Sequence, residues 1–186
     1  MIKIGQEIPL TQASSNTRWN LKIIGHAHMF YQYFPSVSEE PVVSSSSLNP
    51  ILLHQYMEKP VSYFKEEQDP NDKNKCSKRF VSFVISRRGY DISLKLFVFP
   101  KTVVREIKKQ SADVYKYNWE IIKKGAGLGT IYFVEKLDPV EIDDNTLRIV
   151  NDAIESVSVK DAVVNRKRIF ITAKYTDFNR FDIMDI

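Results

Sequence analysis

The sequence has few of the residues that disulfide-bonded, secreted or membrane proteins depend on. Only one of its 186 residues is a cysteine, Cys76, so the chain forms no internal disulfide and suits a reducing compartment. It contains no run of about 18 apolar residues, so we expect no membrane-spanning helix. The first residues, MIKIGQEIPL, lack the basic-then-apolar pattern of a signal peptide. We therefore expect a cytoplasmic protein with no membrane partner.

Signals of catalysis are also scarce. The sequence has no GxSxG, HExxH or GxxxxGK[ST] motif. His26 and His28 would share one face of a strand, and with His54 and Cys76 they could supply four metal ligands. No CxxC or HxxxH spacing supports zinc, which favours ordinary polar or core histidines. We predict that the protein is not an enzyme and has no cofactor or metal.

Basic charge is concentrated in the middle of the chain. Residues 73–136 hold 15 Lys and Arg against 5 Asp and Glu, whereas residues 1–72 and 137–186 are both net acidic. A solvated lysine-rich face would account for this pattern. A centre that binds a polyanion between two acidic flanks is the more specific interpretation.

The basic segment also carries the clearest structural pattern. Two strands, Arg79–Arg87 and Tyr90–Phe99, should meet at a turn around Arg88–Gly89. They are followed by a helix over Lys101–Gln110 and two more strands, Tyr115–Lys123 and Thr130–Lys136. This order of hairpin, helix and hairpin predicts a mainly β fold, a β-barrel like the OB fold, with a few short α-helices.

The flanking segments complete the predicted domain organisation. We expect strands at Arg18–Gly25 and His28–Phe34, a short helix at Pro50–Met57 and a mobile polar connection at 65–77. After a cap within Asp143–Asn145, Leu147, Val150, Ile154 and Val157 recur at helical spacing, and a strand follows at Arg168–Tyr175. Residues 1–136 would then form the barrel, with a polar insert near 35–77. Residues 137–186 would form a helix–strand extension packed on the barrel, with a short acidic end.

The glycine-rich loop Gly125–Gly129 partly resembles the GxGxxG motif of dinucleotide-binding folds. That motif requires a helix directly after it, so that phosphate lies at the helix N-terminus. Here the next residues, TIYFV, are β-branched and aromatic and favour a strand. We therefore predict a hairpin loop whose glycines adopt positive φ.

Aromatic and basic side chains alternate through the middle segment, a pattern typical of proteins that bind single-stranded nucleic acid. Lys and Arg neutralise phosphates, and aromatic rings stack on bases of any sequence. The predicted DNA-binding residues are Arg79, Arg87, Arg88, Tyr90, Lys95, Phe97, Lys101, Tyr115, Tyr117, Trp119, Lys123, Lys124 and Tyr132. Alternation puts Tyr115, Tyr117 and Trp119 on one face with Lys123. It leaves open which face is concave and which rings belong to the core.

The run from Phe97 to Pro139, about 43 residues, resembles the single-stranded-DNA-binding proteins of tailed bacteriophages. The residues that carry the resemblance are Pro100, Lys101, Thr102, Val103, Val104 and Ile107, then Trp119, Ile121, Gly125, Gly127, Leu128, Thr130, Tyr132, Val134 and Pro139. Many members of that family hold zinc in a Cys/His cluster, which this sequence lacks. Many also end in a long acidic tail, whereas Asp177 to Ile186 is short and has three Asp.

The resemblance implies an OB-type barrel that binds single-stranded DNA without sequence preference. Such a protein protects exposed strands and melts hairpins during phage or mobile-element DNA replication and recombination, here in the host cytoplasm. Replication proteins that bind the C-terminal end are implied as partners, and a homodimer is compatible with the sequence. The residues do not distinguish DNA from RNA.

Two other classes of function remain open. One is a phage-type interaction protein that binds a host protein through its aromatic surface and has no role with nucleic acid. The other is an enzyme that acts on nucleic acid, with Glu120, Glu135 or Asp138 holding Mg²⁺. No clustered acidic motif supports the enzyme, which makes it the weakest of the three hypotheses.

Overall fold

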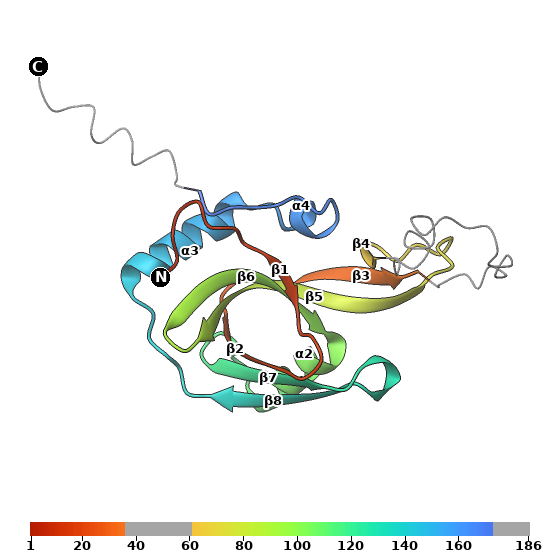
Figure 1. Cartoon of the computed structure of the whole chain (residues 1–186), viewed down its shortest axis with the longest axis horizontal. Coiled ribbons are helices and arrows are strands. Elements are labelled where there is room, and N and C mark those ends of the chain that lie inside the picture. Colours follow the sequence, from red (N-terminus) through yellow and green to blue (C-terminus); the bar gives the residue numbers. More distant parts are fainter. Residues whose placement is uncertain (36–60, 173–186) are drawn as a thin grey trace, which may run out of the picture.

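The computed structural model describes residues 1–35 and 61–172, and the fold in them is mainly β, as predicted (Figure 1). The strands are β1 (Leu10–Gln12), β2 (Thr17–Ile23), β3 (His28–Phe34), β4 (Tyr63–Lys65), β5 (Lys75–Arg88), β6 (Asp91–Pro100), β7 (Asn118–Lys124) and β8 (Ile131–Leu137). The helices are α2 (Lys101–Gln110), α3 (Asp144–Ser156) and α4 (Val159–Val163), with a 3-10 turn, η1, at Gly127–Gly129. The predicted helix at Pro50–Met57 lies outside the described residues.

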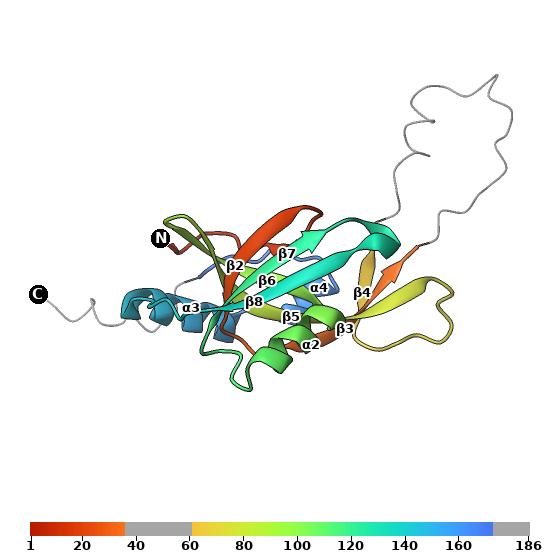
Figure 2. The same ribbon diagram turned by 90° about the horizontal axis from the view of Figure 1, so that it is seen from below.

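All eight strands belong to one open, mixed sheet organised around β5. The path through the sheet is β1-β6-β5-β2-β7-β8, and β3 and β4 extend it beside the first half of β5. Only β1 pairs in parallel, on β6. The sheet curls strongly, and α2 lies between β6 and β7 in the chain (Figures 1 and 2). This arrangement is consistent with an OB-like fold, in which β5 and β6 correspond to the second and third strands.

A bulge separates β2 from β3, although both strands pair with β5. Ile23 lies opposite Val84 and His28 opposite Val81, so four residues, 24–27, face only two on β5. A bulge of this kind bends the strand and strengthens its twist. Gly25 lies at the bend, where a Cβ would come within 3.2 Å of the Cβ of Phe83. A side chain at position 25 would therefore require Phe83 to shift by a few tenths of an ångström.

The central strands are buried on both faces, which explains their nearly continuous apolar sequence. On the inner face, Val84 and Phe97 pack with Leu21 and Trp119 and with Val103 and Ile107 of α2. On the outer face, residues that alternate with these, such as Phe83 and Leu96, pack with Val150 and Ala153 of α3 and with α4. The sheet thus separates two apolar clusters, and the inner one supports the site described below.

The two longer helices begin where the sequence predicts. α2 spans Lys101–Gln110, as expected, with Pro100 before its first residue. α3 begins after Asp143, whose Oδ1 accepts a hydrogen bond from the backbone N–H of Thr146 at 2.9 Å. The predicted cap is therefore confirmed. Among the described helices, none has both the length and the apolar character needed to cross a membrane.

The residues after α3 pack back onto the start of the chain. The backbone N–H of Ile8 donates to the carbonyl of Ile169 at 2.9 Å, and Arg168 forms an ion pair with Glu7 at 2.6 Å. Ile169 and Ile171 are both buried, which confirms that they face the same way. The strand predicted over Arg168–Tyr175 is not formed in the part of this range that the structure describes. The β pairing found there, up to residue 172, is an isolated bridge between Glu7 and Phe170. The rest of that range lies outside the described residues.

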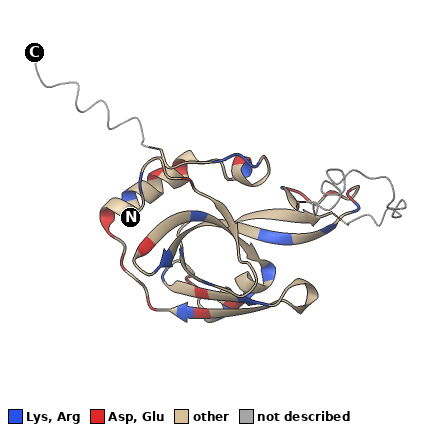
Figure 3. Ribbon diagram, in the orientation of Figure 1, with Lys and Arg blue, Asp and Glu red and all other residues tan. Residues whose placement is uncertain are grey.

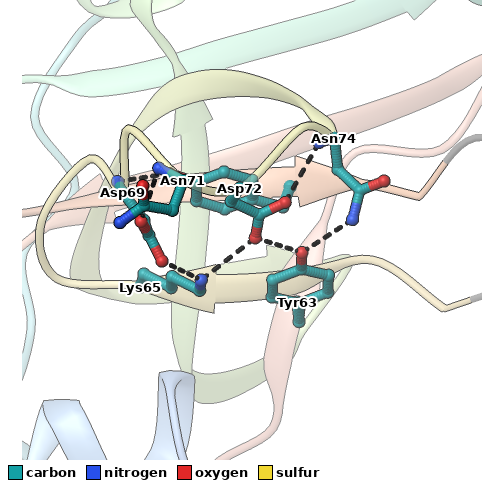
Figure 4. Close-up of polar contacts among 7 residues, drawn as sticks. Tyr63, Lys65, Asp69, Asn71, Asp72 and Asn74 are labelled. Atoms are coloured by element: carbon teal, nitrogen blue, oxygen red, sulfur yellow. Dashed lines mark hydrogen bonds and ion pairs between the residues drawn. The ribbon is translucent and has the colours of Figure 1, made fainter.

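The polar connection at 65–77, predicted as a mobile segment, forms a set of contacts among its own side chains, and its last three residues belong to β5 (Figure 4). Lys65 Nζ lies 2.9 Å from Asp69 Oδ2 and 3.0 Å from Asp72 Oδ2. The two aspartates also accept hydrogen bonds from backbone N–H groups two residues further on, those of Asn71 and Asn74. Polar composition predicts a loop, but it does not reveal such mutually satisfied contacts.

Candidate nucleic-acid interface

A groove with a volume of about 540 Å³ opens at the end of the β5–β6 hairpin, beside the start of β2. Its lining is mainly polar and basic, with one tryptophan. The lining residues are Thr17, Arg18, Trp19, Ser86, Arg87, Arg88, Asp91, Ser93 and Lys95. We refer to these nine residues as the groove.

The pairing of β5 with β6 explains why the groove begins where it does. On the inner face, successive pairs run from Val84–Lys95 through Ser86–Ser93 to Arg88–Asp91. The side chains therefore change from apolar to polar toward the hairpin tip, because every second residue of a strand faces the same side. The inner apolar cluster ends at Val84, and polar side chains that can meet a ligand continue the same surface.

Trp19 is the aromatic side chain of the groove. Its ring is half-buried and meets the edge of Phe97 with centroids 5.4 Å apart. Its indole Nε1 donates to Thr17 Oγ1 at 3.3 Å, and Lys95 Nζ lies 6.0 Å from the ring centroid. The core thus holds the ring in place while a cation lies next to it, the combination that binds a base and its phosphate together.

The groove carries more positive than negative charge. Four basic residues line it against one acid, Asp91. Arg18 is 3.6 Å from Glu120, and Arg87 Nη2 donates to the carbonyl of Glu141 at 3.2 Å. Within residues 1–35 and 61–172, no carboxylate lies within 4.0 Å of Arg88 or Lys95 in an ion pair. Acidic residues gather instead along the segment from β8 into α3 (Figure 3).

Arg87 has one side-chain nitrogen without a partner in the described part of the chain. Its Nε is buried and has no hydrogen-bond partner in the described part of the chain. A buried donor without a partner costs free energy, so such groups are rare and call for an explanation.

The structure brings together three of the predicted DNA-binding residues, Arg87, Arg88 and Lys95. Tyr90 lies next to them in the hairpin turn and is fully exposed, although the sequence had suggested that it begins a strand. Lys123 lies opposite Thr17, so it adjoins the groove from β7. These five residues form the part of the predicted set that lies in or beside the groove.

For two residues, the prediction that their rings stack on bases is wrong. Phe97 and Trp119 are both completely buried in the inner apolar cluster, so neither ring offers a face to a base. The indole Nε1 of Trp119 donates to the carbonyl of Val114 at 2.9 Å. The face of β7 shared by Trp119 and Lys123 is therefore the inner one, and Trp119 on this face packs in the core instead of facing a ligand.

The other predicted residues do not line the groove. Tyr115 and Tyr117 precede β7, and the ring of Tyr117 has Lys136 Nζ at 4.6 Å and Lys116 Nζ at 5.5 Å. Lys124 Nζ lies 5.0 Å from the ring centroid of Phe133. Lys101 is exposed at the start of α2.

Arg79 and Tyr132 are both half-buried in the fold. Arg79 is half-buried, and its Nε donates to Gln32 Oε1 at 2.9 Å. Burial lowers the pKa of Arg79 and raises the pKa of the Tyr132 hydroxyl. Both side chains are therefore engaged within the fold, apart from the groove.

Sequence reasoning missed Arg18 and Trp19 as site residues. It assigned Trp19 to the buried face of a strand, together with Leu21 and Ile23. The predicted face is correct. Of these three residues, however, Trp19 lies nearest the start of β2, where the inner apolar cluster ends, so its ring is only half-covered. The one signal in the sequence that could have indicated these site residues is a basic residue, Arg18, directly before a tryptophan, Trp19, near the start of a strand.

The glycine-rich loop is a hairpin loop, as predicted, and β8 follows it. Gly125 and Gly127 have φ values of 77° and 57°. A Cβ on Gly125 would lie 2.5 Å from the carbonyl oxygen of Gly129, so no other residue fits there without a shift. In the described ranges, no group of three or more His, Cys, Asp or Glu side chains is arranged to hold a metal ion.

Comparisons of the chain with protein-family models, with curated proteins and with solved structures gave no match.

Proposed function

We propose that this protein binds single-stranded DNA in the groove, without sequence preference, and protects exposed strands during phage or mobile-element replication and recombination. The observation that carries the proposal is the position of Trp19, a ring supported by Phe97 beside Lys95 and close to Arg88. The ring would stack on a base while the cations contact phosphates. No step of catalysis is involved, and the host cytoplasm is the expected location.

Two further features support the proposal. The groove is lined in part by β5 and β6, which correspond to the second and third strands of an OB fold, strands that contribute to oligonucleotide binding in that fold. A strand bound in the groove would contact a ring face and positive charges. Neither kind of contact distinguishes the edges of the bases, so binding would show little sequence preference.

Fluorescence anisotropy with a labelled oligo-dT at about 50 and about 200 mM salt tests the proposal, with unlabelled duplex as competitor. We expect a plot of log affinity against log salt concentration to have a slope of roughly −0.7 per phosphate contacted. The duplex should not displace the labelled oligo-dT. Trp19→Ala should weaken binding roughly 5- to 100-fold, the range for loss of one stacked base.

Phe133→Ala is the matched control, because Phe133 is an exposed aromatic residue outside the groove. It should bind oligo-dT like the wild type. Absence of oligo-dT binding at low salt would overturn the proposal, and tighter binding to oligo-U would replace DNA with RNA as the ligand.

A second candidate function, binding of a protein partner, is favoured by one observation. Leu128, Ile131 and Phe133 are all exposed apolar residues near the tip of the β7–β8 hairpin. Ile131 and Phe133 project on the same side of β8, because they are two residues apart. If this surface carries the function, Phe133→Glu should abolish a stoichiometric complex with a host protein and leave oligo-dT binding unchanged.

A further inference from the structure

The tip of the β5–β6 hairpin displays a tyrosine that neither the turn nor the core accounts for. Tyr90 is fully exposed, with 105% of the accessible surface expected for the residue. The turn requires only Gly89, whose φ is 62°, because position 90 has the negative φ that any residue adopts. The turn therefore tolerates an aromatic ring at position 90 without requiring one.

The hairpin is paired up to its last two residues. β5 and β6 pair without interruption from Arg79–Pro100 to Arg88–Asp91, so only Gly89 and Tyr90 extend beyond the last pair. A ring on such a short, fully paired hairpin can be presented at a defined position, unlike a ring on a long loop. The residues on both sides of the turn, Arg88 and Asp91, also line the groove. Tyr90 is therefore located at the mouth of the groove.

The size of the groove limits what can enter it. Pockets of about 300–1,000 Å³ hold a ligand the size of a drug, and this groove, at about 540 Å³, lies within that range. A groove of this volume suits a short stretch of one strand. The hairpin tip lies beside it in the chain, so a duplex that continues from the bound strand would begin near Tyr90.

We propose that Tyr90 stacks on the first base pair of a duplex that adjoins the bound strand, so that the preferred ligand is a junction between single-stranded and double-stranded DNA. The ring supplies an apolar face that covers the end of the helix, and Arg88 beside it contacts the phosphates at the junction. This inference rests on the proposed function of the groove. It adds a second kind of ligand contact and a substrate class.

The test compares three labelled DNAs by anisotropy: an oligo-dT tail, the same tail joined to a blunt hairpin duplex, and the duplex alone. Tails of both polarities are used. The wild type should bind one junction roughly 5- to 100-fold more tightly than the tail, the range expected for one stacking contact. Tyr90→Ala should reduce this ratio to about one, whatever its effect on tail binding alone, whereas Tyr90→Phe should preserve the ratio.

A fluorescent adenine analogue in the first base pair provides a second measurement. Stacking of Tyr90 should change its emission in the wild type and in Tyr90→Phe, but not in Tyr90→Ala. Tyr115→Ala is the matched control, since Tyr115 is also exposed and lies outside the groove.

The failures of the two proposals are distinguishable. If the wild type does not bind the tail, the proposed function itself fails. If it binds tail and junction equally, or if Tyr90→Ala weakens both by the same factor, the groove function stands and the junction inference is overturned.

Discussion

The groove and the segment from β4 into the loop after it are both rich in charge. Lys65 pairs with Asp69 and Asp72 there, whereas two of the groove's cations, Arg88 and Lys95, have no ion-pair partner among the described residues. In the loop, Lys65 contacts two carboxylates and lies near the stacked rings of Tyr33 and Tyr63 (Figure 4). In the groove, Arg88 and Lys95 face solvent without a carboxylate partner among the described residues. Charge that is neutralised internally orders a segment, whereas charge left over is available to a ligand.

The two regions also differ in what supports them. The loop consists of local contacts, mostly between residues fewer than twelve positions apart. The groove is assembled from β2, β5 and β6 over the inner apolar cluster. We therefore expect a change in the cluster to damage the groove most, and four experiments sharpen this comparison, from the largest expected effect to the smallest.

Phe97→Ala should have the largest effect. Phe97 is completely buried and supports Trp19 at 5.4 Å, so its removal leaves a cavity beneath the groove. We expect the free energy of unfolding to fall by about 3–5 kcal/mol in urea denaturation. Phe133→Ala, at an exposed position, should cost less than about 0.5 kcal/mol. Equal effects of the two changes would contradict the assignment of Phe97 to the core.

Removing the unpaired charges of the groove should come next. The double variant Arg88→Gln, Lys95→Gln should weaken oligo-dT binding about 10- to 100-fold, because charge-assisted contacts to phosphate are lost. The slope of log affinity against log salt should become shallower by roughly 0.7 for each contact removed. Arg148→Gln on α3 is the matched control and should leave both quantities unchanged. An unchanged slope in the double variant would show that these side chains do not contact phosphate.

The loop should respond to acid instead. Hydrogen bonds from Tyr63 and the backbone of Asn74, with the neighbouring Lys65, lower the pKa of Asp72 to about 2. Because the unfolded chain holds this proton more tightly, with a pKa of about 3.9, the stabilisation is complete above pH 4 and is lost as the pH falls toward 2. Nuclear magnetic resonance titration of the Asp72 carboxyl should show the lowered pKa.

Denaturation of Asp72→Asn in the same pH range provides the control. This variant should be less stable than the wild type at neutral pH and should lose less stability between pH 4 and pH 2. A wild-type Asp72 that titrates at its ordinary value would mean that the loop contacts are absent in solution.

Exposed cations outside the groove should matter least. Lys101→Gln and Lys124→Gln, tested separately, should each change oligo-dT affinity less than about twofold, because neither residue lines the groove. Anisotropy under the conditions used for the double variant measures this. A tenfold loss in either variant would extend the interface to α2 or to the β7–β8 hairpin.

Much of the fold followed from local patterns. The bounds of α2, the cap at Asp143, the strand β3 and the turn glycines at 89 and 125 all depend on residues within a few positions of one another. Strand ends were less accurate. Tyr115 precedes β7 and Tyr90 lies in a turn, because aromatic residues favour strands in general but do not show where pairing stops.

The candidate site was predicted only in part, for a different reason. Arg87, Arg88 and Lys95 were found because basic charge is visible in composition. Trp19 was missed, and Trp119 was wrongly chosen, because both are tryptophans on strands with the same alternation. The difference between them is the extent of the inner cluster, which covers Trp119 fully and Trp19 only in part.

The sequence by itself determined where the longer strands and the two longer helices lie, where turns require glycine, and that basic charge is concentrated between residues 73 and 136. These properties are local, since they arise from side-chain periodicity and backbone sterics. Only the tertiary structure decided which face of each strand is inner, which cations remain unpaired and that Trp19 lies beside Lys95. Those outcomes depend on strand register and on the curl of the sheet, which bring residues far apart in the chain into contact.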